Sequence, residues 1–215
     1  MGIQKSVITF SGKIGGLRGS SWKGKKVVAQ QPSTYNDAKT PVQQANRRKF
    51  ADVQLLGRQV LAAVKVGLKT QAIGKTEANV FTQLNMPAAS DDGSVATIAL
   101  DDVKVAKGNL AGVSNYNVAP GNNAGQLVLT WNNNSNGGSG LPTDMICTCD
   151  VCEYKQPDSA STFTMHNVNR AAGTVTITMP ASHVGHEAHV YAFFRRAGTN
   201  EVSDSSVDKA QVPAA

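Results

Sequence analysis

From residue 91 onward, short segments with alternating apolar residues follow one another, and no helical stretch lies between them. The alternation has a period of two, which is the period of a β-strand. These segments are "SVATIAL", "VKVA", "QLVLTWN", "DMICTCDVCEY", "TVTITMP", "AHVYAFFRRA" and "EVSDSSV". Because parallel strands need crossover helices, the pattern predicts an antiparallel β-sandwich over residues 91–215, with Trp131 and Tyr191 as anchors of its core.

A long amphipathic helix is predicted before the sandwich, from Thr40 to about residue 70. Thr40 can cap the helix, Pro41 takes the first helical position, and Gln43 completes a capping box. Gly57 and Gly67 lie inside the helix, which indicates close packing against another backbone or a bend. The apolar stripe, at steps of three and four residues, consists of Val42, Phe50, Val53, Leu56, Val60, Val64 and Leu68.

A second, short helix is predicted from Thr76 to about Met86, with Gly74 as the stop of the first helix. The expected fold is therefore α+β and mainly β. Three parts are expected: a basic glycine-rich hairpin arm over residues 1–39, a helical segment over residues 40–90, and the sandwich domain over residues 91–215.

The stretch "GKIGGLRGSSWKGKKVV", residues 12–28, places Gly19, Gly24 and Lys25 at the spacing of a phosphate-binding loop. Such a loop requires Ser or Thr after its lysine and then a helix. Here Lys26 occupies that position, and "VVAQQP" follows as a strand that ends at a proline. The stretch therefore predicts a hairpin with glycine turns and exposed lysines. An isolated hairpin is marginally stable in water, so this one needs a surface to lie on.

Positive charge is concentrated at the start of the chain. Residues 1–75 contain 14 lysines and arginines against Asp37 and Asp52, a net +12, whereas residues 76–215 carry a net −6. Such asymmetry predicts an acidic partner, which is nucleic acid, an anionic surface or the acidic half of a neighbouring copy. The expected interface residues are Lys13, Arg18, Trp22, Lys23, Lys25, Lys26, Arg47, Arg48 and Lys49.

Several segments of the sequence resemble known protein families. "LVLTW", "CDVCEY" and "HVYAFFRRAGTNEVSDS" are similar to the strands of immunoglobulin and fibronectin type III-like domains. The whole chain resembles an uncharacterised family of Bacteroidota and phage-associated proteins, in which the "GKIGGLRGSSWKGKKVV" hairpin and a "TPVQQANRRKFADV" helix precede a sandwich. The resemblance implies this architecture and no activity.

Two clusters have metal-ligand chemistry. Cys147, Cys149 and Cys152 form C-x-C-x-x-C without a fourth ligand, so we expect two buried thiols on one strand face and one outward thiol. "HVGHEAH" contains His183, His186 and His189, which are a lesser candidate for a metal site if a loop gathers them.

No motif specifies a reaction: G-x-S-x-G and H-E-x-x-H are both missing from the sequence. We therefore expect a protein that is not an enzyme and has no cofactor, a structural or assembly subunit of a virion, tail or appendage. The partners expected are further copies or companion subunits. A nucleic-acid-binding protein and a glycan-binding sandwich are the alternatives.

Neither a secretion signal nor an apolar run of membrane-spanning length is found in the sequence. We expect synthesis in the cytoplasm, incorporation into a particle, and no membrane insertion.

Overall fold

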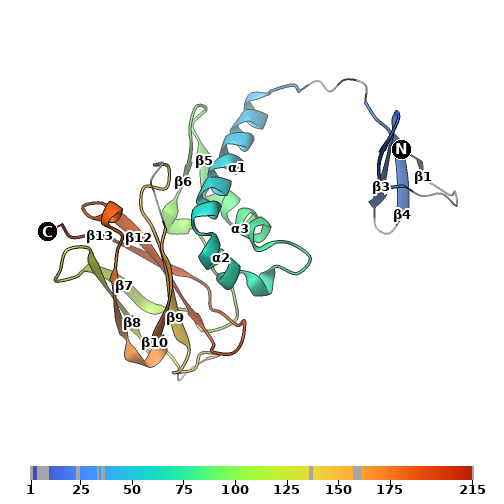
Figure 1. Ribbon diagram of the computed structural model, residues 1–215. Helices are drawn as coiled ribbons and strands as arrows, with labels where there is room; N and C mark the ends of the chain where they lie inside the picture. The colour runs from blue at the N-terminus through green and yellow to red at the C-terminus, as the bar shows by residue number, and fades with distance from the viewer. Residues whose placement is uncertain are drawn as a thin grey trace. The chain divides into compact units, whose positions relative to one another are not determined.

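The computed structural model describes residues 2–3, 10–22, 25–32, 34, 37–135, 138–156 and 161–214 (Figure 1). The chain divides into two compact units, Met1–Thr40 and Pro41–Ala215. The sequence-based expectation divides the chain after residue 39, and the compact units divide after Thr40. The boundary expected at residue 90 does not separate two compact units, because the helices and the sandwich share a hydrophobic core.

The first unit contains a small antiparallel sheet with the strand order β1-β4-β3-β2. The strands are β1 (Gly2–Ile3), β2 (Gly12–Ile14), β3 (Leu17–Trp22) and β4 (Lys25–Gln30). Gly15, between β2 and β3, has a φ of 54°. This left-handed conformation strains residues that have a Cβ, which explains the glycine at this turn. The predicted hairpin is thus the centre of a four-stranded sheet.

This sheet has very little core among its described residues. Val27 is its buried hydrophobic residue, whereas Ile14 and Leu17 are 60% and 47% exposed. Phe10 packs over Gly19, where an added Cβ would lie 2.4 Å from the Phe10 carbonyl oxygen. A sheet of this size that buries so little apolar surface has a small margin of stability.

The second unit is built in three layers around a central sheet (Figure 1). The central sheet has the order β10-β9-β12-β13, with β9 (Met145–Val151), β10 (Phe163–Asn169), β12 (Glu187–Arg195) and β13 (Ser206–Gln211). A three-stranded sheet of order β11-β8-β7 covers one face, with β7 (Ser114–Pro120), β8 (Gln126–Asn132) and β11 (Thr174–Thr178). The helices and the hairpin β5 (Ala89–Asp91) and β6 (Ala96–Ile98) pack on the other face.

Among the described residues the sandwich has seven strands, but they are not the seven that the alternation predicts. Strands β7 and β10 lie in segments for which no strand is expected. The segment "SVATIAL" contributes β6 to the separate hairpin, and residues 103–106 form no strand. Strands β7 and β10 are partly exposed and rich in Asn, a residue depleted in strands, so their composition gives only a weak strand signal.

The long helix is divided in two. Helix α1 spans Pro41–Gln59 and α2 spans Leu61–Gly67, and Val60 between them has a φ of −89° and a ψ of 14°. Backbone hydrogen bonds continue across this point, because Val64 N–H donates to the Val60 carbonyl oxygen at 3.0 Å. Val60 is therefore a local bend in one helical segment. A short 3-10 turn, η1 (Lys69–Gln71), follows.

The second helix, α3, spans Glu77–Asn85, as the sequence predicts. The Thr76 hydroxyl oxygen accepts a hydrogen bond from the backbone N–H of Asn79 at 3.2 Å. This contact satisfies one of the four N–H groups that a helix leaves unpaired at its start.

The central sheet is buried on both faces. Cys147, Cys149 and Tyr191 face the helical layer, whereas Cys152 and Trp131 belong to the core between the two sheets. The expectation of an outward Cys152 thiol is wrong, because its side of the strand faces that second core. Tyr191 anchors the helix–sheet core and not the inter-sheet core, and its hydroxyl donates to the Leu100 carbonyl oxygen at 2.8 Å.

Gly67 is expected to be a site where alanine destabilises a helix. A Cβ at Gly67 would lie 2.5 Å from the Val105 carbonyl oxygen and 2.6 Å from the Ala106 Cβ, so two backbones meet here without a side chain between them. Helix propensity alone favours alanine by about 1 kcal/mol. Overpacking should reverse that sign, so Gly67→Ala should lower the free energy of unfolding by about 1–3 kcal/mol.

Urea unfolding of Gly67→Ala checks this prediction. Gly112→Ala is the control, because a Cβ there has no heavy atom within 4 Å, and it should change stability by less than about 0.5 kcal/mol. Equal stability of Gly67→Ala and the native chain would contradict the close approach.

Candidate interaction surfaces

The small N-terminal sheet brings two predicted interface residues directly together. In the register of β2 and β3, Lys13 lies opposite Arg18. Residues directly opposite in an antiparallel pair share a face, and like charges there repel each other. Both side chains are exposed, and neither has a carboxylate partner among the described residues. The sheet therefore holds two uncompensated cations side by side.

The other predicted residues of this unit extend the positive charge. Lys25 and Lys26 begin β4 and are exposed. Trp22 is the register partner of Lys25, and Lys23 lies outside the described residues. Counted by unit, residues 1–40 contain seven lysines and arginines against one aspartate, while residues 41–215 contain fourteen of each sign. The whole net charge of +6 thus belongs to the first unit.

Of the three predicted interface residues on α1, Arg48 makes contacts within its own unit. Arg48 forms a bidentate ion pair with Asp91, at 2.7 Å from Nε to Oδ2 and 2.8 Å from Nη2 to Oδ1, and Nη2 also donates to the Gly93 carbonyl oxygen. The hydrogen bond from Arg48 lowers the pKa of Asp91. Arg48 therefore fastens the β5–β6 hairpin to α1. Arg47 is exposed and Lys49 is half-buried.

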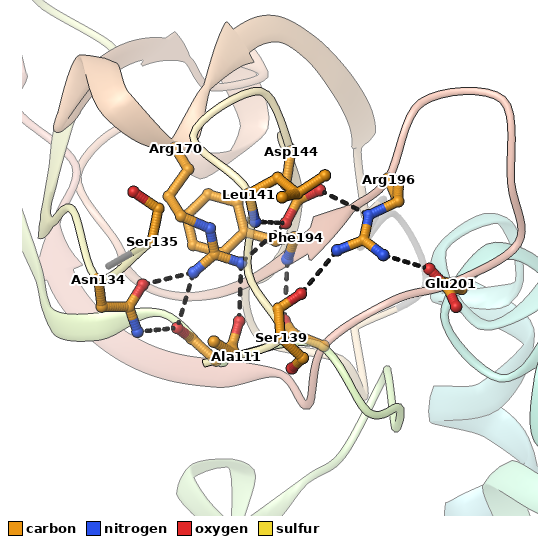
Figure 2. Close-up of polar contacts among 12 residues, drawn as sticks. Ala111, Asn134, Ser135, Ser139, Leu141, Asp144, Arg170, Phe194, Arg196 and Glu201 are labelled. Carbon is orange, nitrogen blue, oxygen red and sulfur yellow. Dashed lines mark hydrogen bonds and ion pairs between the residues drawn. The ribbon is translucent and has the colours of Figure 1, made fainter. Parts of the chain in front are cut away.

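A buried arginine that the sequence prediction did not single out organises one end of the sandwich (Figure 2). Arg170 and Asp144 are fully buried, and Arg170 Nη2 lies 3.4 Å from Asp144 Oδ2. The Arg170 guanidinium stacks on the Phe194 ring, 3.8 Å from its centroid. It also donates to the Ala111 carbonyl oxygen at 2.8 Å and to Asn134 Oδ1 at 2.5 Å.

Figure 2 shows that the Asp144 carboxylate continues the network toward the surface. Asp144 Oδ2 accepts from the Leu141 N–H at 2.7 Å, and its Oδ1 lies 3.3 Å from Nε of Arg196. Arg196 in turn pairs with Glu201 at 2.6 Å. These charged side chains thus join three loops, and their spacing in the sequence does not predict the contacts. Both carboxylate oxygens of Asp144 are used in contacts within the protein. We assign this network a structural role.

The three histidines are not brought to one site. Each lies against a different carboxylate: His183 Nδ1 is 3.0 Å from Asp150 Oδ2, His186 Nδ1 is 3.4 Å from Glu153 Oε1, and His189 Nε2 is 3.3 Å from Asp101 Oδ1. His183 is buried, His189 is partly buried and His186 is exposed. Within the described part of the chain, no three His, Cys, Asp or Glu side chains are grouped as metal ligands.

The three cysteines are buried thiols without disulfides. Burial raises the pKa of Cys147 to about 12 and that of Cys152 to about 11, and it raises the pKa of Cys149 still further. A nucleophilic cysteine needs the opposite shift, toward the thiolate. The geometry therefore favours a packing role for all three side chains.

Raised thiol pKa values make the folded state less stable at high pH. The folded protein holds its thiols neutral while the unfolded chain ionises near the ordinary value of 9, so this contribution is complete below pH 9 and is lost as the pH rises toward 11–12. We expect urea midpoints to fall over this range, and to fall less steeply for Cys147→Ala. An identical slope for the variant would contradict the assignment.

Within the described residues, no helix has both the length and the apolar character needed to cross a membrane.

The helices and the two packed antiparallel sheets confirm the predicted α+β, mainly β fold with a sandwich. The fn3 domain of the human collagen alpha-1(XX) chain is 16% identical, with a TM-score of 0.35, and the match covers 50% of this chain and 89% of that domain. A redesigned β-sandwich protein is 15% identical, with a TM-score of 0.33, over 49% of this chain and 93% of that one.

A family 76 glycoside hydrolase from a bovine Bacteroides thetaiotaomicron strain is 12% identical, with a TM-score of 0.38, over 48% of this chain and 21% of that one. Comparison with curated protein sequences finds no match. A family model matches residues 9–207, which include most of the N-terminal sheet, all of the helices and nearly the whole sandwich. The chain belongs to DUF6266, a family of unknown function.

Proposed function

We propose that this protein is a non-enzymatic structural or assembly subunit whose basic N-terminal sheet docks on an acidic surface of a neighbouring subunit. The observation that carries the proposal is the unpaired Lys13–Arg18 juxtaposition, in a unit that holds the whole net charge of +6. An anionic group placed between these two side chains removes their repulsion and gains two charge-assisted hydrogen bonds.

The poor core of the N-terminal sheet supports the same proposal. Ile14 and Leu17 expose apolar surface beside the cations, and Val27 is the buried hydrophobic residue of the described part. Protein interfaces bury apolar residues at their centre and place charges at the rim. A protein partner with an acidic, partly apolar surface would therefore cover both features. The resemblance to Bacteroidota and phage-associated proteins makes a virion, tail or appendage the assembly that we propose.

A charge reversal separates docking from a purely structural role. Lys13→Glu converts the repulsive pair into an attractive one, so it should leave the N-terminal sheet intact and stabilise it by a few tenths of a kcal/mol. The same change should release the protein from its assembly, because it removes the anion site. Mass photometry of assemblies purified from cells that make native or Lys13→Glu protein measures this release.

Lys75→Glu is the matched control, because Lys75 is an exposed lysine of the second unit and its side chain donates to Gln83. Unchanged assembly with Lys13→Glu would contradict the proposal. Assembly lost equally in both variants would also contradict it, since the effect would then be one of net charge.

Nucleic acid is the competing partner, because phosphates also fit between Lys13 and Arg18. Binding to nucleic acid would show steep salt dependence. A gel shift with single-stranded and duplex DNA and RNA at low and moderate salt distinguishes the two partners. Tight binding that Lys13→Glu removes would favour the nucleic-acid function over the assembly function.

A further inference from the structure

A second charged surface lies on the central sheet, where the helical layer ends. Two adjoining cavities of about 140 and 120 Å³ share Met165 and Arg195. The first has a floor of Met145 and Cys147, and the second is bordered by Lys65 and Lys69 of α2 and η1. We call these two cavities together the cationic groove.

The cations of this groove are uncompensated. Among the described residues, no carboxylate lines either cavity. Lys65, Lys69 and Arg195 have no carboxylate partner among the described residues. Arg195 instead donates to Met165 Sδ at 3.3 Å and to the Thr199 carbonyl oxygen at 3.4 Å. The groove therefore fits a ligand that combines a small apolar group with a carboxylate. A cavity of about 150 Å³ holds a group the size of benzene, so each cavity has room for a valine side chain.

The same chain carries such a ligand at the tip of its β5–β6 hairpin, residues 92–95. Val95 is 52% exposed. Asp92 Oδ1 accepts from the N–H groups of Val95 at 2.7 Å and Ser94 at 2.8 Å, and these bonds lower the pKa of Asp92 to about 2. Arg48 pairs with Asp91 and also interacts with the charge of Asp92, but no cation among the described residues lies within ion-pair distance of Asp92. The tip thus presents one permanent carboxylate and one apolar side chain on a braced turn.

The tip and the groove are far apart on one molecule. Arg48 contacts the tip at Gly93, and Lys65 follows 17 residues later along α1 and α2, which is about 25 Å at 1.5 Å per residue. In Figure 1 the β5–β6 hairpin extends beside the first turns of α1, at the opposite end of the helical layer from α2. A tip cannot fill the groove of its own chain, but it can fill that of another copy.

We propose that the hairpin tip of one copy inserts into the cationic groove of the next, with Val95 in a cavity and Asp92 against Lys65, Lys69 and Arg195. Such a contact uses two different surfaces of the same molecule. It therefore propagates head to tail, into a ring if the rotation closes and into a filament if it does not. It extends the proposed assembly role to a surface separate from the N-terminal sheet. Because the contact is small, its affinity is expected in the micromolar range or weaker.

A charge swap in the full-length protein tests the contact. Asp92→Lys gives the tip a positive charge, which the native cationic groove repels. Lys65→Glu/Lys69→Glu gives the groove two negative charges, which repel the native tip. By sedimentation velocity over a range of concentrations, each variant alone should associate at least tenfold more weakly than the native chain. A one-to-one mixture should associate again, because both of its contacts then join opposite charges.

The double change Lys75→Glu/Lys104→Glu is the control, since it alters the net charge equally at two exposed lysines outside the groove; it should associate like the native chain. Recovery in the mixture cannot arise from misfolded variants. The proposal is overturned if the native chain is monomeric up to its solubility limit, if its association ignores the variants, or if the mixture does not recover. All three variants keep the N-terminal sheet native. A negative result for the groove therefore does not affect the proposed docking of that sheet, which Lys13→Glu tests separately.

Discussion

Replacing Arg170 by methionine is expected to lower the free energy of unfolding by about 3–5 kcal/mol, the range seen when one partner of a buried ion pair is removed. The Asp144 carboxylate would remain fully buried with only its Leu141 and Arg196 contacts. The Ala111 carbonyl oxygen and the Asn134 side chain would lose their donor as well. Chemical denaturation monitored by far-ultraviolet circular dichroism measures the loss.

Arg58→Met is the control, because Arg58 is exposed on α1, and its cost should stay below about 0.5 kcal/mol. The double variant Arg170→Met/Asp144→Leu should be less destabilised than the sum of the two single changes, since it leaves no buried charge without its partner. Additive single effects, or a loss under about 1 kcal/mol for Arg170→Met, would contradict the role that the contacts give to this pair.

Phe81→Ala should have a comparable effect, about 3–5 kcal/mol, through loss of packing between the helices. Phe81 is 1% exposed and lies in the core between the helical layer and the central sheet. Its ring fills the space above Gly57 of α1, where an added Cβ would lie 3.0 Å from the ring. The same denaturation experiment measures the change, and Phe50→Ala is the control because Phe50 is 51% exposed.

The pair Phe81 and Gly57 also predicts a change of sign. In the native chain Gly57→Ala presses a methyl group against the ring, so the gain of about 1 kcal/mol in helix propensity should be lost. In the Phe81→Ala background the ring is gone, and Gly57→Ala should recover that gain. A Gly57→Ala effect that is the same in both backgrounds would show that the two residues are not coupled.

Local patterns predicted the parts of this fold that depend on neighbouring residues. Helix α3 begins directly after Thr76, and Gly12 and Gly19 lie in a small sheet. Gly57 and Gly67 were interpreted as sites of close backbone packing or of a bend, and Val105 and Ala106 pack closely against Gly67. Helix position and turn geometry are encoded within a few residues of chain, whereas the residues that pack against Gly67 come from a distant segment.

Some predictions were wrong for strands that are buried on both faces. The β9 segment is buried toward the helices on one face and toward β8 and β11 on the other, so its alternation does not tell solvent from a second core. For that reason Cys152 was expected to point outward, and Tyr191 was assigned to the wrong core. Strands β7 and β10 were missed because they are rich in Asn, which is depleted in strands, although each pairs with the strand adjacent to it in sequence, β8 and β9.

The sequence by itself determined the charge polarity, the position of α3 and the mainly β character, since these follow from composition and from the period of side chains along the chain. Only the tertiary structure decided that the helices cover the sandwich, that Arg48 braces a hairpin while Lys13 and Arg18 face each other unpaired, and that Arg170 lies buried on Asp144. The reason is that ion pairing and burial depend on which distant segments meet, and that is fixed by the packing of the whole unit and not by the spacing of its residues.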